Sequence, residues 1–562
     1  MTTQAEIEQP TKPPEGHHHP EKWAWWQYFT FNTDHKVIAI QYFVTSFLFY
    51  FVGGFLAELV RTELATPEPD FLQPEVYNQV FTMHASIMLF LWIIPAGTGA
   101  FANFLIPLMV GAKDMAFPKL NAVAYWLFLA GGILACGGFL VGPAQAGWTS
   151  YPPLSLITGK AGQEIWILSV IILGASSMLG AINYVTTMLK MRTPQMTIHD
   201  MPLFCWSMLA TSGLILLGTP VLASALILLS FDLLAGTNFF NPTGGGDPIV
   251  YQHLFWFYSH PAVYIMVLPF FGIISEVLPV HARKPIFGYR AIAYSSLAIS
   301  FLGLIVWAHH MFTSGTPGWL RMFFMATTML IAVPTGIKVF SWCATIWGGK
   351  ISLNTPMLFG MGFISAFLIG GLSGVMIASV PFDIHVHDTY FIVAHFHYVL
   401  FGGAVLGLFS GLYHWFPKIT GRMYNEFWGR VHFFLTFIGF NMTFLPMHKL
   451  GLVGMNRRIA MYDPQFQDLN VICTIGSYIL AVSTIPFVIN IVWSWFWGPQ
   501  AGRNPWRALT LEWSTSSPPP IENFDEEPIL WSGPYEYGID SEFVDADQSV
   551  EDLLEEVKAE AV

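Results

Sequence analysis

Residues 383–400, DIHVHDTYFIVAHFHYVL, contain four histidines, two of them in a stretch that is otherwise apolar. These two, His395 and His397, lie in a run that stays compatible with a helix to about Phe416. Residues that are two positions apart on an α-helix differ by about 200° of rotation, so the two imidazoles are predicted to point to opposite sides of one helix. One metal ion cannot use both rings, whereas two flanking cofactors can each use one. Because imidazole is a common axial ligand of haem iron, two haems are one interpretation; two hydrogen-bonded core histidines are the other.

The composition places this helix in a membrane. Of the 562 residues, 54% are hydrophobic and 11% are charged, whereas soluble chains carry about 25% charged residues. We expect an all-α, polytopic bundle of about twelve transmembrane helices, since each crossing needs about 20 apolar residues. The expected spans are about 36–60, 78–106, 120–142, 163–189, 203–231, 252–279, 290–311, 321–346, 356–380, 390–416, 428–449 and 470–498.

One membrane bundle, residues 36–500, is expected between two polar ends. Residues 1–35 end in an interfacial WAWWQYF stretch and include the triplet His17, His18 and His19, a weak metal hypothesis. Residues 501–562 are acidic and supply much of the net charge of −12, which gives no indication of nucleic-acid binding. We expect this tail to be partly disordered or packed on a partner. The four cysteines form no CxxC pair and are interpreted as small core residues.

Lysines and arginines set the expected orientation, with both ends of the chain in the cytoplasm. The loops expected inside carry most of these residues, for example Lys113 and Arg192. Arg457 and Arg458 are the exception, because their loop falls on the outer side. Two adjacent cations there need an anionic partner, and haem propionates suit guanidinium geometry. Lipid headgroups are the alternative.

Another histidine, His84, lies in the second expected span. Ionisable side chains inside a membrane are costly and indicate function. If the second span packs beside the tenth, His84 and one of the two opposed histidines can hold one iron from both sides. The remaining histidine then leaves its own iron with an open position, which substrate binding requires.

The sixth span reads YQHLFWFYSHPAVYIMVLP, and the seventh ends in VWAHHMFTSGTPGW. His260 and Tyr264 are four residues apart and share a helix face. His309 and His310 diverge by about 100° on a regular helix, so we expect the TSGTPG sequence after them to distort the helix end until both reach one point. Three imidazoles then suit a copper ion. Hydrogen-bonded core histidines are again the alternative.

Together these residues resemble subunit I of the haem–copper oxidases, most closely the cytochrome c oxidase branch. The resemblance covers about residues 30–500 and rests on HPAVY, WAHHMFTSG, PTGIKVFSW, HDTYFIVAHFHYVL and the NRR loop. It implies a terminal oxidase that reduces dioxygen to water at a high-spin haem and copper pair. Electrons would arrive through a low-spin haem, and additional protons would be moved outward.

The resemblance also implies ligands for two haems, both expected to be of the heme a type, and for metal ions. The low-spin haem would use His84 and His397, and the high-spin haem His395. Copper (CuB) would be held by His260, His309 and His310, with Tyr264 covalently linked to His260 and supplying an electron and a proton. The other implied positions are His387 and Asp388 for magnesium, Arg457 and Arg458 for the propionates, Arg61 for the low-spin haem's formyl or tail, and Glu63 near a calcium or sodium site.

A buried, proton-consuming centre needs polar residues that lead protons to it. Lys338 lies three residues after Thr335, on nearly the same helix face, and resembles the family's lysine-channel residue that leads toward Tyr264. Asp114, with Asn103 and Asn121 nearby, resembles the mouth of the family's second proton path. Without the resemblance, Asp114 is best interpreted as an ordinary loop carboxylate.

The chain departs from the commonest family pattern at the inner end of that second path. Many relatives have a glutamate in HPEVY, whereas this chain has Ala262 within YSHPAVY. Tyr258 shares a helix face with Ala262, so its hydroxyl is expected to take the place of the carboxylate. A phenol is a poorer acid than a carboxyl group, which favours a hydrogen-bonded relay with Ser259 and water over ionisation.

The expected partners are a subunit II with dinuclear copper, a subunit III and other oxidase subunits, cytochrome c or a membrane-bound cytochrome donor, dioxygen and the lipid membrane. A bacterial plasma membrane is the expected location, with a thylakoid as the alternative, since no transit peptide is visible. Quinol oxidase is the nearest rival, because this chain does not encode the electron donor. Tyr264 disfavours nitric oxide reductase, which generally lacks it, and a haem-free transporter is a rival from another class.

Overall fold

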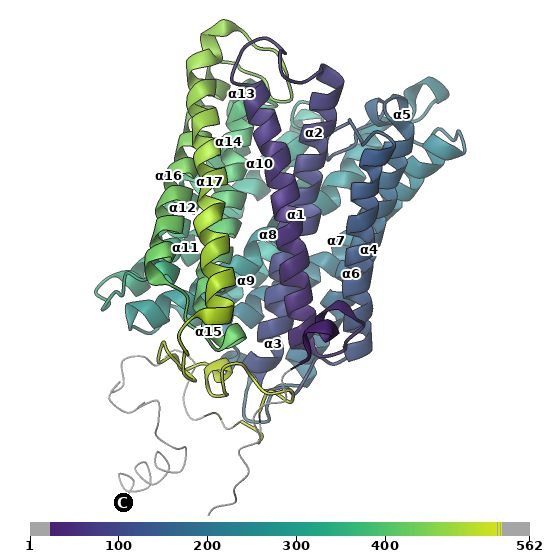
Figure 1. Cartoon of the computed structure of the whole chain (residues 1–562). Helices are drawn as coiled ribbons and strands as arrows, with labels where there is room; N and C mark the ends of the chain where they lie inside the picture. Colours follow the sequence, from purple (N-terminus) through teal and green to yellow (C-terminus); the bar gives the residue numbers. More distant parts are fainter. Residues whose placement is uncertain (1–22, 525, 529, 531–562) are drawn as a thin grey trace, which may run out of the picture.

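The computed structural model describes residues 23–524, 526–528 and 530, so the His17–His19 triplet and part of the acidic tail lie outside the described residues. Within these ranges the chain is helical, with isolated bridges but no strand. The long helices run side by side in one bundle (Figure 1). Their bounds are α1 His35–Glu63, α2 Pro74–Ser86, α3 Ala102–Val110, α4 Pro118–Gly137, α5 Leu154–Ile157, α6 Lys160–Lys190, α7 Leu203–Leu234, α8 Pro248–Ala282, α9 Tyr289–Gly303, α10 Gly318–Leu330, α11 Ala332–Ile346, α12 Thr355–Ala378, α13 Val380–Val386, α14 Tyr390–Val399, α15 Leu406–Thr420, α16 Glu426–Leu452 and α17 Gln467–Trp497.

Ten helical stretches of the described chain are long and apolar enough to cross a membrane. The two remaining expected spans are helical as well. The span expected at 290–311 consists of α9, with only 15 residues, followed by the short 3₁₀ helix η7 (Trp307–Met311). The span expected at 428–449 lies within α16, whose 27 residues include buried polar side chains such as His432 and Thr436. The prediction of an all-α, polytopic membrane bundle is confirmed.

Two of the spans change their helical pitch along their length. The second span, Pro74–Val110, passes from α2 through two π-helical segments, η2 (Ile87–Ile93) and η3 (Pro95–Phe101), into α3. The span Tyr390–Thr420 contains a third, η8 (Leu400–Val405), between α14 and α15. π-Helical turns are rare and occur frequently at functional sites. Both spans carry histidines that are predicted haem ligands, just before the π segment begins.

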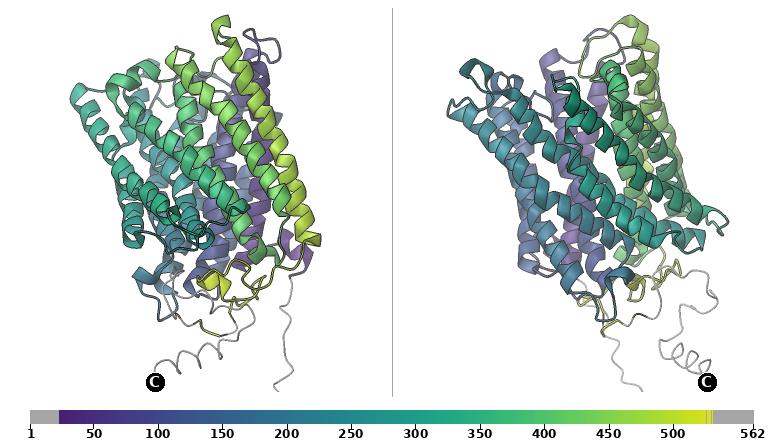
Figure 2. Two further views of the ribbon diagram at one scale, coloured as in Figure 1. Left: turned by 90° about the vertical axis from the view of Figure 1, so that its left-hand side faces the viewer. Right: turned by 180° about the vertical axis from the view of Figure 1, so that it is seen from behind.

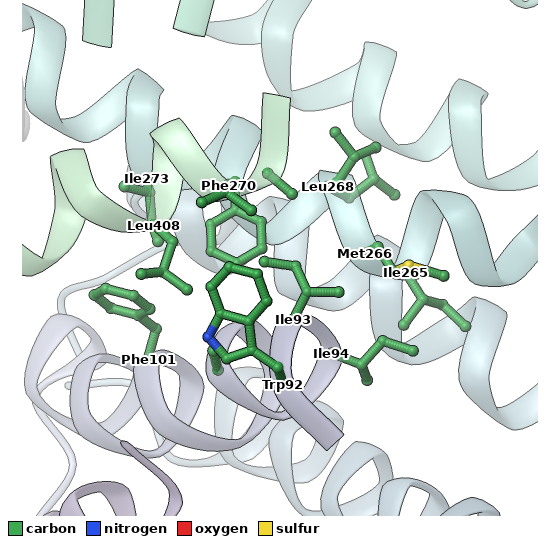
Figure 3. Close-up of a cluster of buried hydrophobic side chains, with 14 of the residues drawn as sticks. Trp92, Ile93, Ile94, Phe101, Ile265, Met266, Leu268, Phe270, Ile273 and Leu408 are labelled. Carbon is green, nitrogen blue, oxygen red and sulfur yellow. The ribbon is translucent and has the colours of Figure 1, made fainter. Parts of the chain in front are cut away.

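The second and sixth spans form the centre of the bundle. In the most apolar stretch of each, 94% and 89% of the residues are buried, whereas most of the other spans keep a broad exposed face. A helix that is apolar on all sides is stable only when it is surrounded. Figure 3 shows the contact between the two: Trp92 and Phe101 of the second span lie against Phe270 and Ile273 of α8, beside Leu408 of α15.

The described residues after α17 pack against one end of the bundle. We call the end with the start of α1, the loop 111–117 and the residues after α17 the lower end, as drawn in Figure 1, and the opposite end the upper end. The described residues after α17 gather beneath the bundle in both further views (Figure 2). Lys418, near the end of α15, fixes them, because its ammonium group donates to the main-chain oxygens of Arg503, Thr515 and Ser516. The described part of the tail therefore packs on the bundle itself.

Candidate metal centre

Three histidines from two elements converge inside the bundle. His260 lies in α8, and His309 and His310 lie in η7. Nδ1 of His260 is 3.3 Å from Nε2 of His310, and Nε2 of His309 is 3.0 Å from that same atom. One nitrogen of each ring thus lies within 4.8 Å of the other two. Three convergent imidazoles with no acidic side chain among them fit a copper ion.

The convergence of His309 and His310 depends on a helix break, but not at the expected place. We predicted a distortion in the TSGTPG sequence after the pair. Instead α9 ends at Gly303, ahead of the pair, and Val306 leaves the helical region with φ −123° and ψ 0°. The chain then continues as the short 3₁₀ helix η7, which carries both histidines.

A hydrogen bond orients one of the three rings, and aromatic stacking orients a second. The hydroxyl of Thr328 donates its proton to the carbonyl of Phe324, so it accepts from Nδ1–H of His309, 2.9 Å away. This leaves Nε2 of His309 unprotonated and directed into the cluster, as a metal ligand requires. The ring of His310 stacks on the indole of Trp256, with ring centroids 3.7 Å apart.

Tyr264 lies beside His260, as their spacing predicts. The two rings meet edge to face with centroids 4.8 Å apart. Nε2 of His260 is buried and has no hydrogen-bond partner among the described residues. A buried polar atom without a partner is rare and calls for an explanation. Gly303 lies close to the tyrosine ring, and a Cβ there would come within 3.2 Å of it.

The opposed pair of α14 faces two different helices. Nδ1 of His395 is 3.0 Å from Oγ of Ser373 in α12, and that hydroxyl donates its own proton to Gly370. His395 must therefore donate through Nδ1, which leaves Nε2 as its ligand atom. On the other side, the ring of His397 stacks on Phe444 of α16, with centroids 4.0 Å apart. The 200° spacing thus separates the two rings as predicted.

His84 and His397 each donate a hydrogen bond from Nδ1 to a main-chain carbonyl. Nδ1 of His397 donates to the carbonyl of Val393, and Nδ1 of His84 donates to the carbonyl of Gly53, each over 2.8 Å. The two rings are close enough to interact electrostatically. Metal-bound histidines usually donate their second N–H to a carbonyl in this manner. The residues present therefore fit an iron held between two imidazoles.

At the upper end, Arg457 has a protein carboxylate as its partner. Its Nε donates to Oδ1 of Asp388 over 2.7 Å, and its Nη2 makes a second, shorter contact. Burial, the largest single influence, raises the pKa of Asp388, but Arg457, His387 and Arg458 together lower it below its usual value. His387 is 3.7 Å from the same carboxylate and 3.3 Å from Asp383. We expected haem propionates as the partner of both arginines. For Arg457 the structure adds a second anionic partner, the carboxylate of Asp388.

Arg458 differs from its neighbour. It makes no ion pair within the described ranges, and its pKa is lowered to about 10 by burial and by the charge of Arg457. Arg61 is similar: one nitrogen donates to Asn470 and Thr474, while Nε and Nη1 are buried without a partner among the described residues. Unpaired guanidinium donors fit carboxylate or carbonyl groups of a cofactor. Buried Glu63 accepts from the main-chain N–H groups of residues 71 and 72.

Lys338 is fully buried without an acidic partner in the described part of the chain. Its ammonium group donates to Ser296 Oγ over 2.6 Å and to the carbonyl of Ile292 over 3.0 Å. The hydroxyl of Thr335, in contrast, is bonded to the carbonyl of Ile331 in its own helix. A lysine held by one hydroxyl and one carbonyl keeps a donor for a further partner.

Asn103 and Asn121 meet near the lower end, where Asn121 Nδ2 donates to Asn103 Oδ1 over 2.5 Å. Asn103 also contacts the hydroxyl of Tyr184, which lines a cavity of about 40 Å³. A second cavity of about 30 Å³ shares Ser177 with the first and reaches Tyr258. Each is large enough for at least one water molecule. The two cavities therefore lie next to each other, one lined by Tyr184, the partner of Asn103, and the other by Tyr258.

Ser259 does not join this arrangement directly. Its hydroxyl is buried and has no hydrogen-bond partner among the residues described, so the expected contact with Tyr258 is not formed. Consecutive helical residues point about 100° apart, which carries the serine side chain away from the cavity that Tyr258 lines.

Several supporting residues were not predicted from the sequence. Thr328, Ser373 and Asn470 orient or contact candidate ligands, but polar residues in membrane helices commonly bond their own backbone, so the sequence does not single them out. Trp256 is different. It lies four residues before His260 on the same helix face, a spacing that marks it as a neighbour of the cluster.

A bundle of this size with a three-imidazole cluster inside it, and with further histidines whose second ring nitrogens are hydrogen-bonded, defines an integral membrane protein built to hold redox metals. The sequence matches the family described as cytochrome c and quinol oxidase polypeptide I over residues 37–479, and the chain belongs to that family. It is 74% identical to "Cytochrome c oxidase subunit 1" of Synechocystis sp. (strain ATCC 27184 / PCC 6803 / Kazusa) over 95% of this chain and 97% of the relative.

Other comparisons agree with this assignment. The chain is 63% identical to "Cytochrome c oxidase subunit 1" of Thermostichus vulcanus, over 93% of this chain and 95% of the relative. It is 50% identical to "Probable cytochrome c oxidase subunit 1-beta" of Nocardia farcinica (strain IFM 10152), over 93% of this chain and 89% of the relative. A solved heme–copper terminal oxidase dimer, at 18% identity, shares the fold with a TM-score of 0.70 over 94% of this chain and 98% of its own.

Proposed function

We propose that this chain is the catalytic subunit of a cytochrome c oxidase, which reduces dioxygen to water and moves protons across the membrane. The convergence of three imidazole nitrogens with Tyr264 packed on His260 is the observation that carries this proposal. His395 lies within electrostatic range of His309, so the residue proposed to hold the high-spin haem is near the residues proposed to hold copper. The relatives described above are named cytochrome c oxidases, which favours this function over quinol oxidase.

Each cofactor has its own set of residues in this proposal. CuB is held by His260, His309 and His310, a high-spin haem by His395, and a low-spin haem by His84 and His397, both haems being of the heme a type. When bound, these groups supply the electron path and the open position where dioxygen binds. The protein holds each ligand ring in one tautomer through Thr328, Ser373, Val393 and Gly53. Such fixed rings need no rearrangement when a metal binds.

Tyr264 has the most direct chemical role among the side chains. Its phenol is proposed to release a proton and an electron when the oxygen bond breaks, so that no partly reduced oxygen leaves the site. The unpaired Nε2 of His260 beside the tyrosine ring supports a covalent link between the two side chains. Such a link would fix the phenol next to the copper site.

Two groups of residues are proposed to deliver protons. Lys338, with Thr335 one turn away, serves the route toward Tyr264. Asp114, Asn103 and Asn121 serve the second route, whose upper part follows the two cavities to Tyr258. Burial is the main reason that the pKa of Asp114 is raised to about 6, which suits a group that exchanges protons near neutral pH. Ser259 is proposed to take part only through water.

The upper end is proposed to bind magnesium, a calcium or sodium ion, and the peripheral groups of the haems. His387 and Asp388 suit magnesium, Arg458 a haem propionate, and Arg61 the formyl or tail of the low-spin haem. Arg457 is shared between Asp388 and a propionate. A calcium or sodium ion at Glu63 is supported by one carboxylate oxygen, Oε1, that is buried without a partner among the described residues.

The proposed partners are a subunit II with dinuclear copper, a subunit III and a cytochrome c or membrane-bound cytochrome donor. We place the complex in a bacterial plasma membrane, with the lower end in the cytoplasm. The basic residues Lys113, Lys190 and Arg192 lie at this lower end, which agrees with the usual excess of positive charge inside.

The test is Tyr264→Phe, which removes one hydroxyl and keeps the ring. The variant is expected to keep both haem spectra and to lose most oxygen consumption with reduced cytochrome c. Tyr294→Phe is the matched control, because Tyr294 lies exposed on α9 and contacts none of the candidate ligands of the copper or haems. Near-normal turnover in Tyr264→Phe would refute the assigned role.

A further inference from the structure

One side chain of the C-terminal segment is buried at the lower end with an unusual number of polar contacts. Asn523 is fully buried and has a left-handed backbone, φ 68°. Its Nδ2 donates to the carbonyls of Ala112 and Lys113, at 2.9 and 3.1 Å. Its Oδ1 accepts from Nζ of Lys36 at 2.9 Å. The amide thus joins the start of α1 to the loop 111–117.

His35 completes this link toward the asparagine pair. Its Nδ1 is 2.7 Å from the carbonyl of Asn103 and must donate there, so Nε2 of the neutral ring is an acceptor. Nε2 lies 2.9 Å from Nδ2 and 3.0 Å from Oδ1 of Asn523. The amide oxygen can therefore accept from the protonated ring, whereas donation to the neutral ring competes with the carbonyls of Ala112 and Lys113 for the two amide protons.

The segment that carries Asn523 is fastened on both sides. Thr515 Oγ1 donates to the carbonyl of Asn523 over 2.6 Å, and Lys418 holds the carbonyl of Thr515 over 2.7 Å. Farther along, Thr193 donates to the carbonyl of Pro528. Pro528 also packs on Gly111, where an added Cβ would come within 3.0 Å of the proline ring. The segment is thus held against the loop that contains Asp114.

The charges around Asp114 are set by this same contact. Asp34 and Lys36 face its carboxyl group from the start of α1. Lys36 pairs with Asp34 at 3.1 Å and also donates to the carbonyl of Ile521 in the segment. Lys113, next to Asp114, pairs with Glu522 of the segment at 2.8 Å in an exposed ion pair. An exposed ion pair of that kind contributes little stability by itself, so the buried amide of Asn523 is the main connection between the segment and the loop.

We propose that Asn523 is a positioning residue for proton uptake at Asp114, because its amide holds the C-terminal segment, His35, Lys36 and the loop 112–113 in one arrangement around that carboxyl group. The inference rests on the proposed role of Asp114 in proton delivery. In this proposal the C-terminal segment of the chain forms part of the entrance of the proton path. Small displacements of groups that transfer protons have large effects on rate, so the arrangement matters for turnover.

The experiment uses the purified, complete oxidase and compares four variants. Asn523→Gly removes the amide while glycine still tolerates the left-handed backbone. Asn523→Asp keeps an acceptor for Lys36 but loses the donor to the carbonyls of residues 112 and 113. Asn504→Ala is the matched control, since among the described residues the Asn504 amide bonds to Ala508 of the same segment and to no other. Asp114→Asn tests the path itself.

Oxygen consumption and proton uptake are measured as functions of pH, with the haem spectra as a check on folding. Asn523→Gly is expected to slow turnover at least about fivefold, since one lost hydrogen bond alone corresponds to about that factor and the variant loses the amide bonds to residues 36, 112 and 113. Its pH–rate profile should shift to lower pH, because water reaches Asp114 and relieves the burial that raises its pKa. Asn523→Asp should fall in between, and Asn504→Ala should match the unchanged enzyme.

Three results would overturn the inference. If Asn523→Gly matches the unchanged enzyme while Asp114→Asn is slow, Asn523 has no role and the proposed path stands. If Asn523→Gly and Asn504→Ala are equally slow with an unshifted pH profile, Asn523 serves only to hold the segment. If Asp114→Asn has the normal rate and normal proton uptake, the proposed proton path fails, and the inference fails with it.

Discussion

Replacing Thr328 by valine should weaken copper binding without touching a copper ligand. Valine has nearly the same shape, so the packing of α10 is kept, but the acceptor for Nδ1–H of His309 is lost. The variant loses one hydrogen bond and leaves a buried N–H without a partner, which together cost about 1–3 kcal/mol. That corresponds to a loss of copper affinity of roughly 5- to 150-fold. The range agrees with the 10- to 100-fold effects typical of residues that orient metal ligands.

The assay is the copper content of the purified complex after incubation with a copper(I) chelator under reducing conditions, measured together with oxygen consumption. Thr327→Val is the matched control: Thr327 is its neighbour, also bonds the backbone of α10 and contacts no histidine. Equal copper retention in both variants would refute the argument that Thr328 fixes the tautomer of His309.

Three other predictions follow from single contacts. Lys338→Met removes the ammonium group that contacts Ser296 and is expected to lower oxygen consumption at least about 100-fold, the usual effect of losing a proton-transfer group; a normal rate would exclude it from the path. Tyr258→Phe keeps the cavity shape but removes its hydroxyl, so proton uptake after flash oxidation should slow roughly tenfold; an unchanged rate would mean that water alone carries the protons. Burial raises the pKa of Asp388 and Arg457 lowers it, and the net pKa in the folded protein is below the usual 3.8. The ion pair therefore stabilises the fold above pH 3.8. This stabilisation is lost as the pH falls through the pKa of Asp388 in the folded protein. The melting temperatures of Asp388→Asn and the unchanged protein should therefore converge in acid, and a constant difference down to the lowest pH would contradict the pairing.

Periodicity and composition were enough to predict the membrane bundle and the places of its helices. Apolar runs of the required length determine where the chain crosses the membrane, and the two-residue spacing of His395 and His397 determines that they face different helices. The same kind of argument predicted that Tyr264 would lie beside His260. These features depend only on local helix geometry, which the sequence specifies directly.

Features that depend on packing between distant segments were not predicted in the same detail. The break at Val306 follows the end of α9 at Gly303, and a single glycine in an apolar run does not by itself show that a helix ends there. Asp388 as the partner of Arg457 requires two loops that are far apart in the sequence to meet at the upper end. The polar contacts of Asn523 were likewise beyond prediction, because the acidic composition of the tail does not indicate which of its residues pack on the bundle.

The haem and metal content of the purified complex tests the central claim most directly. The account predicts two haems for each copy of this chain, with copper at the site of His260, His309 and His310. In a His310→Asn variant that copper should be lost while both haem spectra remain. Non-haem iron in place of copper, or a preparation without haem, would contradict the account.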